Sequence, residues 1–257
     1  MASSPVAPPA QAGRPPPRPR RAPVIAYLAA GAALVVCAGL LSYALVHGRQ
    51  RGQAQLLRPS GIPASVSTPL ANLMGLSALP GPVAPGFTLT DQAGRTISLA
   101  SLRGHAVVLE FMDPHCTDIC PIVSAEFVDA YRDLGATAPR VVFLAINVNP
   151  YHRTVADMAA YSREHGLDAI PDWHFVTGPL AALRASWSGY HIAVEAAGPS
   201  ADVQHSSVIY FIDPSGRERF LATPTDDHTA GGTAYLPAGQ LTEWGHGIAL
   251  LARQLAG

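Results

Sequence analysis

The sequence contains no lysine, and its first ninety residues contain no aspartate or glutamate. All seventeen basic residues are arginines, and seven of them precede Asp91. From Asp91 onwards, ten arginines stand against eighteen acidic residues, which gives this part of the chain a formal charge of −8. Because a surface that binds DNA or RNA needs an excess of positive charge, a nucleic-acid-binding role is not expected for the globular part.

Cysteine is also scarce, with three residues in the whole chain. Cys37 lies in an apolar run, so Cys116 and Cys120 are the only thiols of the globular part. Two cysteines are too few for a disulfide framework, and a domain of this size does not need one. The short spacing between Cys116 and Cys120 therefore points to a functional pair.

Charged side chains are absent from residues 24–46. A helix needs about 20 apolar residues to cross a bilayer, and Tyr27 and Tyr43 stand near the ends of the run, where interfacial anchors occur. The sequence predicts a transmembrane anchor; a cleaved signal peptide is the alternative, but its apolar stretch is usually shorter. The Pro- and Arg-rich residues 1–23 are expected to form a disordered tail, which a slight excess of arginine places in the cytoplasm, with the globular domain on the extracytoplasmic side.

Residues 47–83 have no clear hydrophobic period and are interpreted as a tether, so the globular domain is expected to span residues 84–257. In that domain, apolar runs of strand character alternate with helical periodicity. We expect strands at 87–90, 96–99, 106–112, 141–148, 173–177, 207–212 and 217–221, and helices at 121–134, from 154 to about 165, from 179 and from about 238. This alternation is typical of a layered α/β domain.

The two cysteines follow the first long apolar strand, residues 106–112. Asp113 and Pro114 end that strand, and Pro121 suits the first position of a helix that should end at Gly135. The free N–H groups and the dipole at a helix amino terminus favour negative charge, and hence the thiolate form of nearby cysteines. Cysteines at such a strand-to-helix junction make a thioredoxin-like fold the natural candidate.

Cys116 and Cys120 are four residues apart, so they should lie one helical turn apart on the same side. Their sulfurs are positioned to share a disulfide or one metal ion, and two thiolates select soft metals, Cu(I) above all with Zn(II) as a competitor. A third ligand would then come from elsewhere in the fold. A purely structural disulfide is disfavoured, because it would close a loop of only five residues and stabilise little.

Two motifs resemble those of the SCO/SenC family: residues 111–121, which read FMDPHCTDICP, and residues 203–216, which read VQHSSVIYFIDPSG. The resemblance implies a membrane-anchored, thioredoxin-fold copper-binding protein of cytochrome c oxidase assembly. It also implies that Cys116, Cys120 and His205 bind the copper, as Cu(I) or Cu(II). The expected function is a copper metallochaperone in the cell membrane, with a cytochrome c oxidase subunit or another copper-accepting respiratory protein as partner.

A thiol-disulfide oxidoreductase acting on the cysteines of a metalloprotein client is the alternative. Cys116 would then attack and Cys120 would resolve the mixed disulfide. A simple dithiol exchanger has no use for His205, so this histidine discriminates between the two functions. A thiol peroxidase would need Thr and Arg partners around a lone cysteine, and no such pattern is present.

Five further residues near these motifs are open to more than one interpretation. Asp118 is expected to cap the following helix, although it is also placed to help position a metal. His115, next to Cys116, is interpreted either as a residue that tunes the thiolate or as merely exposed. His228, with Asp226 and Asp227, is expected in a solvated loop rather than in a second, weak metal site.

Overall fold

The computed structural model describes residues 40, 42 and 58–257 of the chain. The predicted tail at 1–23, and all but two residues of the predicted anchor at 24–46, lie outside the described residues. Among the residues that are described, no helix is both long and apolar enough to cross a membrane. The chain divides into a unit at Met1–Ala54 and a unit at Gln55–Gly257, and the fold given below is that of the second unit.

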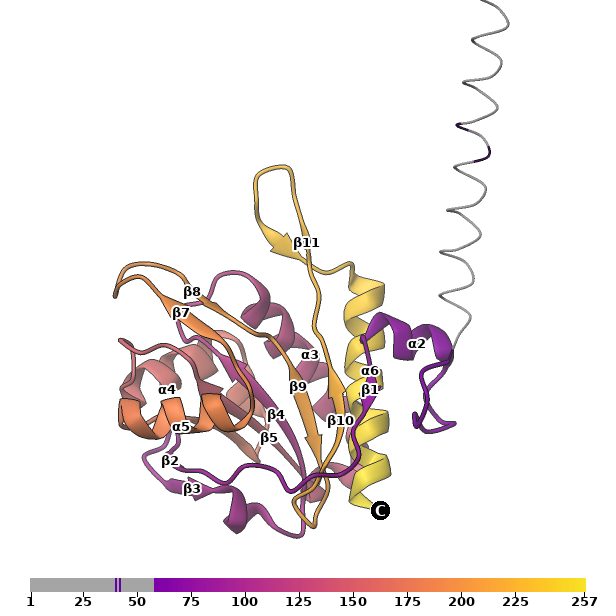
Figure 1. Cartoon of the computed structure of the whole chain (residues 1–257), viewed down its shortest axis with the longest axis horizontal. Coiled ribbons are helices and arrows are strands. Elements are labelled where there is room, and N and C mark those ends of the chain that lie inside the picture. The colour runs from indigo at the N-terminus through magenta and orange to yellow at the C-terminus, as the bar shows by residue number, and fades with distance from the viewer. Residues whose placement is uncertain (1–39, 41, 43–57) are drawn as a thin grey trace, which may run out of the picture. The chain divides into compact units, whose positions relative to one another are not determined.

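A six-stranded mixed sheet forms the centre of this unit (Figure 1). Its strands, in spatial order, are β1 (Ser77–Ala78), β10 (Glu218–Ala222), β9 (Ile209–Ile212), β4 (Ala106–Met112), β5 (Val141–Asn147) and β6 (Trp173–Val176). β4, β5 and β6 run parallel, whereas β9 is antiparallel to β4, and β10 is antiparallel to both β9 and β1. Every residue of β4 and β5 is buried, as their apolar runs predicted.

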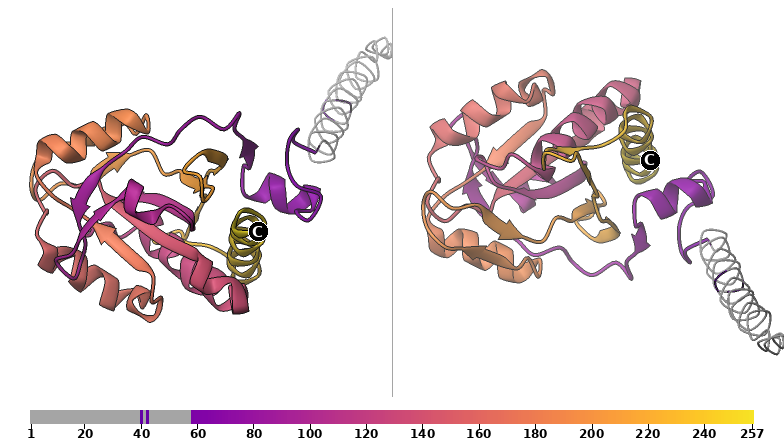
Figure 2. Two further views of the ribbon diagram at one scale, coloured as in Figure 1. Left: turned by 90° about the horizontal axis from the view of Figure 1, so that it is seen from below. Right: turned by 90° about the horizontal axis from the view of Figure 1, so that it is seen from above.

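Helices cover both faces of the sheet, as Figure 2 shows. On one face lie α2, α3, α4 and α6, at Thr68–Leu73, Ile119–Leu134, Val155–Glu164 and Ala238–Ala256. On the other lie α5 (Leu180–Gly189) and the hairpin of β2 (Thr88–Thr90) and β3 (Thr96–Ser98). The side chains of β4 alternate between the two cores: Val108 packs in the first and Val107 in the second.

The predicted helix boundaries are largely confirmed. Gly135 ends α3 with a positive φ of 54°, and Thr154 caps α4 in a reciprocal arrangement with Asp157. Pro179 precedes α5. Pro121 lies in the third position of α3 rather than in the first, because the helix already begins at Ile119. Short 3-10 helices occupy Leu99–Leu102, Gly135–Arg140 and Leu167–Ala169.

The folded unit extends further towards the amino terminus than the expected start at residue 84. Residues 58–83 were expected to form a tether, but they contribute α2 and β1 to the unit. Ser67 caps α2, Leu70 and Met74 are buried in the first core, and β1 pairs with the edge strand β10. This amino-terminal extension was not predicted because α2 has only six residues, too few to show a hydrophobic period.

Two small hairpins were not predicted. β7 (Val194–Ala196) pairs with β8 (Val203–His205), and β11 (Asp227–His228) pairs with β12 (Ala234–Tyr235). Figure 1 shows the β11 hairpin projecting from the body of the unit. Both hairpins carry a histidine at the end of a strand, His205 in β8 and His228 in β11. They are therefore the elements that bring distant residues to the dithiol.

Candidate metal centre

The turn after β4 fixes the position of Cys116. Asp113 is buried, and its Oδ1 atom accepts hydrogen bonds from the backbone N–H of His115 and from the side-chain amide of Asn149, both at 2.9 Å. Its carbonyl oxygen accepts a bond from the N–H of Cys116 at 3.1 Å. Because Asn149 belongs to the loop after β5, this carboxylate ties together the loops at the ends of two parallel strands.

Cys116 and Cys120 are both free thiols, but their surroundings differ. Cys116 is partly exposed, and Cys120 is buried in the first turn of α3. A hydrogen bond from the Cys120 thiol lowers the pKa of Cys116; burial opposes this, and the N–H groups of Cys120 and Asp118 reinforce it. The same bond, followed by burial, raises the pKa of Cys120 well above its usual value. Cys116 is therefore the sulfur that ionises first.

His205, the last residue of β8, directs its imidazole towards this pair. Its Nε2 atom lies 3.9 Å from the Sγ of Cys120, and its Nδ1 atom lies 3.0 Å from the carbonyl oxygen of Ser206. Since a carbonyl oxygen only accepts hydrogen bonds, Nδ1 carries the proton and Nε2 presents a free lone pair. Burial lowers the pKa of His205, so the neutral ring is favoured at pH 7.

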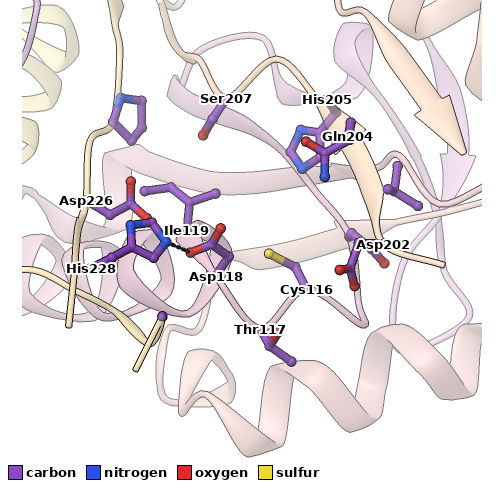
Figure 3. A pocket seen from close by; sticks show the side chains of 14 residues that line it. Cys116, Thr117, Asp118, Ile119, Asp202, Gln204, His205, Ser207, Asp226 and His228 are labelled. Atoms are coloured by element: carbon purple, nitrogen blue, oxygen red, sulfur yellow. Dashed lines mark hydrogen bonds and ion pairs between the residues drawn. The ribbon is translucent and has the colours of Figure 1, made fainter. Parts of the chain in front are cut away.

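Two of the three residues, Cys120 and His205, lie close enough to bind one soft metal ion, whereas the three ligand atoms do not all lie within 4.8 Å of one another, so Cys116 would have to move closer. Metal–sulfur and metal–nitrogen bonds of about 2.3 and 2.0 Å place two donors on one ion no more than about 4.3 Å apart. The observed separation of 3.9 Å between Cys120 Sγ and His205 Nε2 satisfies this limit. Cys116 and His205 also line a pocket of about 460 Å³, drawn in Figure 3, so this donor set is open to the solvent.

The expectation that Asp118 caps α3 is wrong. This residue stands at the amino-terminal cap of α3, but its side chain makes no capping hydrogen bond. Instead, its Oδ1 atom lies 3.1 Å from the Nε2 of His228. His228 was expected in a solvated loop; the structure places it in β11, half-exposed and on the wall of the same pocket.

Sequence reasoning also missed the loop that follows β5. Asn149 accepts hydrogen bonds from the backbone N–H groups of Tyr151 and His152 while it donates to Asp113. The His152 ring stacks on His115 with 3.9 Å between the ring centres. The available signal was the position of Asn149 just after a buried parallel strand, where polar residues commonly serve a site.

A buried carboxyl group lies within β4 itself. Glu110 is 1% exposed, and its Oε1 atom accepts a hydrogen bond from Ser207 at 3.1 Å. Burial raises its pKa to about 8, so it is largely protonated at pH 7. Because Ser207 lies two residues after His205, this contact helps to hold the loop that carries the histidine. Glu110 was not predicted as a site residue, because it stands within the apolar run at residues 106–112.

Comparison with known proteins shows to which family this chain belongs. The model of the SCO1/SenC family matches residues 77–231, which is more than half of the chain. The chain therefore belongs to the SCO1/SenC family, as the two motifs indicated. It is 35% identical over 136 residues to the mitochondrial SCO2 homolog of Bos taurus. That match covers 51% of this chain and 50% of the bovine protein, so the chain matches only half the length of this relative.

Solved structures show the fold. A copper-bound ScoI from Bradyrhizobium japonicum superposes with a TM-score of 0.52 at 22% identity and covers 68% of this chain and 99% of its own. A copper-bound ScoI from Arabidopsis thaliana gives a TM-score of 0.52 at 21% identity, with coverage of 67% and 99%. The fold of the second unit is thus a thioredoxin-like α/β fold, as predicted from the position of the cysteines.

Proposed function

We propose that this protein is a copper metallochaperone that binds one Cu(I) ion through Cys116, Cys120 and His205. The observation that carries the proposal is the free lone pair of His205 Nε2, 3.9 Å from the sulfur of Cys120. A dithiol used only for exchange has no need of a third donor so arranged. Two sulfurs and a neutral imidazole are the soft and borderline ligands that select Cu(I).

The uneven exposure of the two cysteines suits a carrier that must also release its ion. Cys120 holds the metal from the buried side, whereas Cys116 and His205 lie on the pocket wall, where a ligand of an acceptor protein can reach the ion. Binding requires loss of the thiol proton of Cys120, whose raised pKa opposes ionisation in the free protein. Proton uptake at this sulfur would therefore favour release.

Membership of the SCO1/SenC family supports a proposal about which protein receives the copper. The resemblance to the SCO/SenC family implies assembly of the copper site of a respiratory cytochrome c oxidase, and the partner would be an oxidase subunit or another copper-accepting respiratory protein. We place the protein in the cell membrane through one helix at residues 24–46, with residues 1–23 in the cytoplasm and the copper domain outside. A reporter fused after Gly257 that is active only in the cytoplasm would exclude this topology.

The direct test is a Cu(I) titration of the purified full chain under anaerobic conditions, with a chromophoric chelator as competitor. We expect one tightly bound ion per chain, and no tight binding by Cys116→Ser or Cys120→Ser, because a serine hydroxyl is a hard and protonated ligand. A wild-type chain that fails to compete with the chelator would refute the copper function.

One observation favours thiol-disulfide exchange as a second candidate. The pKa of Cys116 is lowered and that of Cys120 is raised, as in a pair with one attacking and one resolving thiol. Cys116 would attack a client disulfide and form a mixed disulfide, and Cys120 would then displace the client's reduced thiol and leave the Cys116–Cys120 disulfide. Reduction of a model disulfide peptide that depends on Cys116 but not on His205 would support this activity.

A further inference from the structure

The β11 hairpin brings His228 against the amino-terminal end of α3. The Nε2 atom of His228 lies 3.1 Å from Asp118 Oδ1 and 3.7 Å from Asp226 Oδ2. Ligand atoms from the three residues all lie within 4.8 Å of one another. Figure 3 shows the three side chains directed towards each other beside Cys116 in one pocket. Two segments separated by more than a hundred residues thus place an imidazole and two carboxylates around one point.

This arrangement has the spacing of a chelating site. Donors held at about 2.0–2.2 Å from one ion lie roughly 3–4 Å apart, which matches both contacts of His228. Asp118 is available as a ligand because it does not cap the helix at whose end it stands. In the described part of the chain, no arginine forms an ion pair with Asp118 or Asp226. The carboxylates of Asp118 and Asp226 interact directly with each other as well as with the imidazole, and a cation would relieve their repulsion.

We propose that Asp118, Asp226 and His228 form a second metal site, independent of the thiols, which binds Cu²⁺. One nitrogen and two carboxylate oxygens are harder ligands than the dithiol and suit a divalent ion. Among the common divalent metals, copper binds such nitrogen and oxygen donors most tightly. This site shares a pocket with Cys116 and His205. It does not rest on the proposed chaperone function, because the two sites use different ligands and can be tested apart.

A competing cluster in the same region is less suited to a metal. Ligand atoms of His115, His152 and Asp157 also lie within 4.8 Å of one another. However, Nε2 of His152 donates to the carbonyl oxygen of Pro199 at 2.9 Å, an acceptor outside the cluster, so metal binding at this nitrogen would break that bond. The proton on Nε2 of His228 instead lies between two donors of the proposed site, so an ion can replace it there. The carboxylate of Asp157 accepts the capping bond from the N–H of Thr154. Two of its three donors thus already have partners outside the cluster.

The test uses the full chain carrying Cys116→Ala and Cys120→Ala, which removes both sulfur donors. Cu²⁺ alone is titrated into this thiol-free chain, and binding is followed by calorimetry and by electron paramagnetic resonance. We expect one Cu²⁺ ion per chain above any weak background, with coupling to one nitrogen. Adding His228→Ala should weaken binding by at least about tenfold, because it removes the only nitrogen ligand. His246→Ala is the matched control, since His246 is also half-exposed but faces a single carboxylate, Asp133, at 2.7 Å.

A second variant keeps the test valid if His228→Ala disturbs the hairpin. Asp226→Asn preserves the shape of the side chain and removes its charge, so we expect it to weaken Cu²⁺ binding with an unchanged melting temperature. Failure of the thiol-free chain to bind Cu²⁺ would overturn the proposal. An equal loss in His246→Ala, or a loss on His152→Ala in place of His228→Ala, would overturn it as well. None of these results would alter the Cu(I) stoichiometry of the wild-type chain, which tests the chaperone function separately.

Discussion

The Nε2 atom of His205 lies 3.9 Å from the sulfur of Cys120, although 85 positions separate the two residues in the chain. The short β7–β8 hairpin delivers the histidine, and the backbone carbonyl of Ser206 fixes its tautomer by accepting the Nδ1 proton. The imidazole is thus oriented before any metal arrives. Preorientation of this kind raises metal affinity, because no bond has to be broken before the ligand can bind.

We predict that His205→Ala weakens Cu(I) binding by at least about tenfold, the size of effect seen when even the supporting contacts of a metal ligand are lost. The disulfide reduction potential of the pair should change little, because both sulfurs remain. Competition against a chromophoric Cu(I) chelator measures the affinity, with His246→Ala as a control at a histidine far in sequence from the dithiol. An unchanged affinity would exclude the three-ligand site and favour the oxidoreductase alternative.

We predict that the two thiols differ sharply in reactivity. Cys116 is partly exposed with a lowered pKa, whereas Cys120 is buried with a raised pKa. Iodoacetamide should therefore modify Cys116 first in the metal-free, reduced chain, and peptide mass spectrometry can assign each adduct. In Cys120→Ala the hydrogen bond to Cys116 is lost, so the pH at which Cys116 reaches half its maximal rate should rise. Equal labelling of both cysteines in the folded wild-type chain would contradict the structure.

We predict that opening a Cys116–Cys120 disulfide leaves the protein folded. The bridge would close a loop of only five residues, and the stabilisation from a disulfide increases with the length of its loop. Cys120 and the strand that precedes the turn are already packed in the cores without it. Thermal melts of the oxidised and the reduced chain should differ by a few degrees at most. A collapse of the melting temperature on reduction would identify a structural bridge instead.

The sequence was informative where burial imposes a pattern. The runs that became β4 and β5 are buried on both faces and were predicted, as were the ends of α3 and α4, where Gly135 and Thr154 provide local signals. The β7–β8 and β11–β12 hairpins were not predicted, because strands of two or three residues are too short to show a period. The equally short β2 and β3 lie within the predicted strands at 87–90 and 96–99. The candidate metal centre depends both on the predicted strand β4 and helix α3 and on the short hairpins that were not predicted. Its sulfurs could be placed from the sequence, whereas the contacts of His205 and Asp118 depend on long-range packing.

The last prediction concerns Glu110, whose burial raises its pKa to about 8, whereas an unfolded chain would give the usual value of about 4.3. Between these two values the folded protein retains a proton that the unfolded chain has already released, so this residue's contribution to stability falls as pH rises from about 4.3 towards 8. Glu110→Gln removes the titration and preserves the acceptor for Ser207. The free energy of unfolding of Glu110→Gln relative to the wild type should therefore increase steadily between pH 5 and pH 8 and level off above that range.

Urea denaturation at several pH values measures the difference, with the exposed Glu195→Gln as the control that should show no trend. A difference that is independent of pH would mean that Glu110 is already ionised in the folded protein at neutral pH.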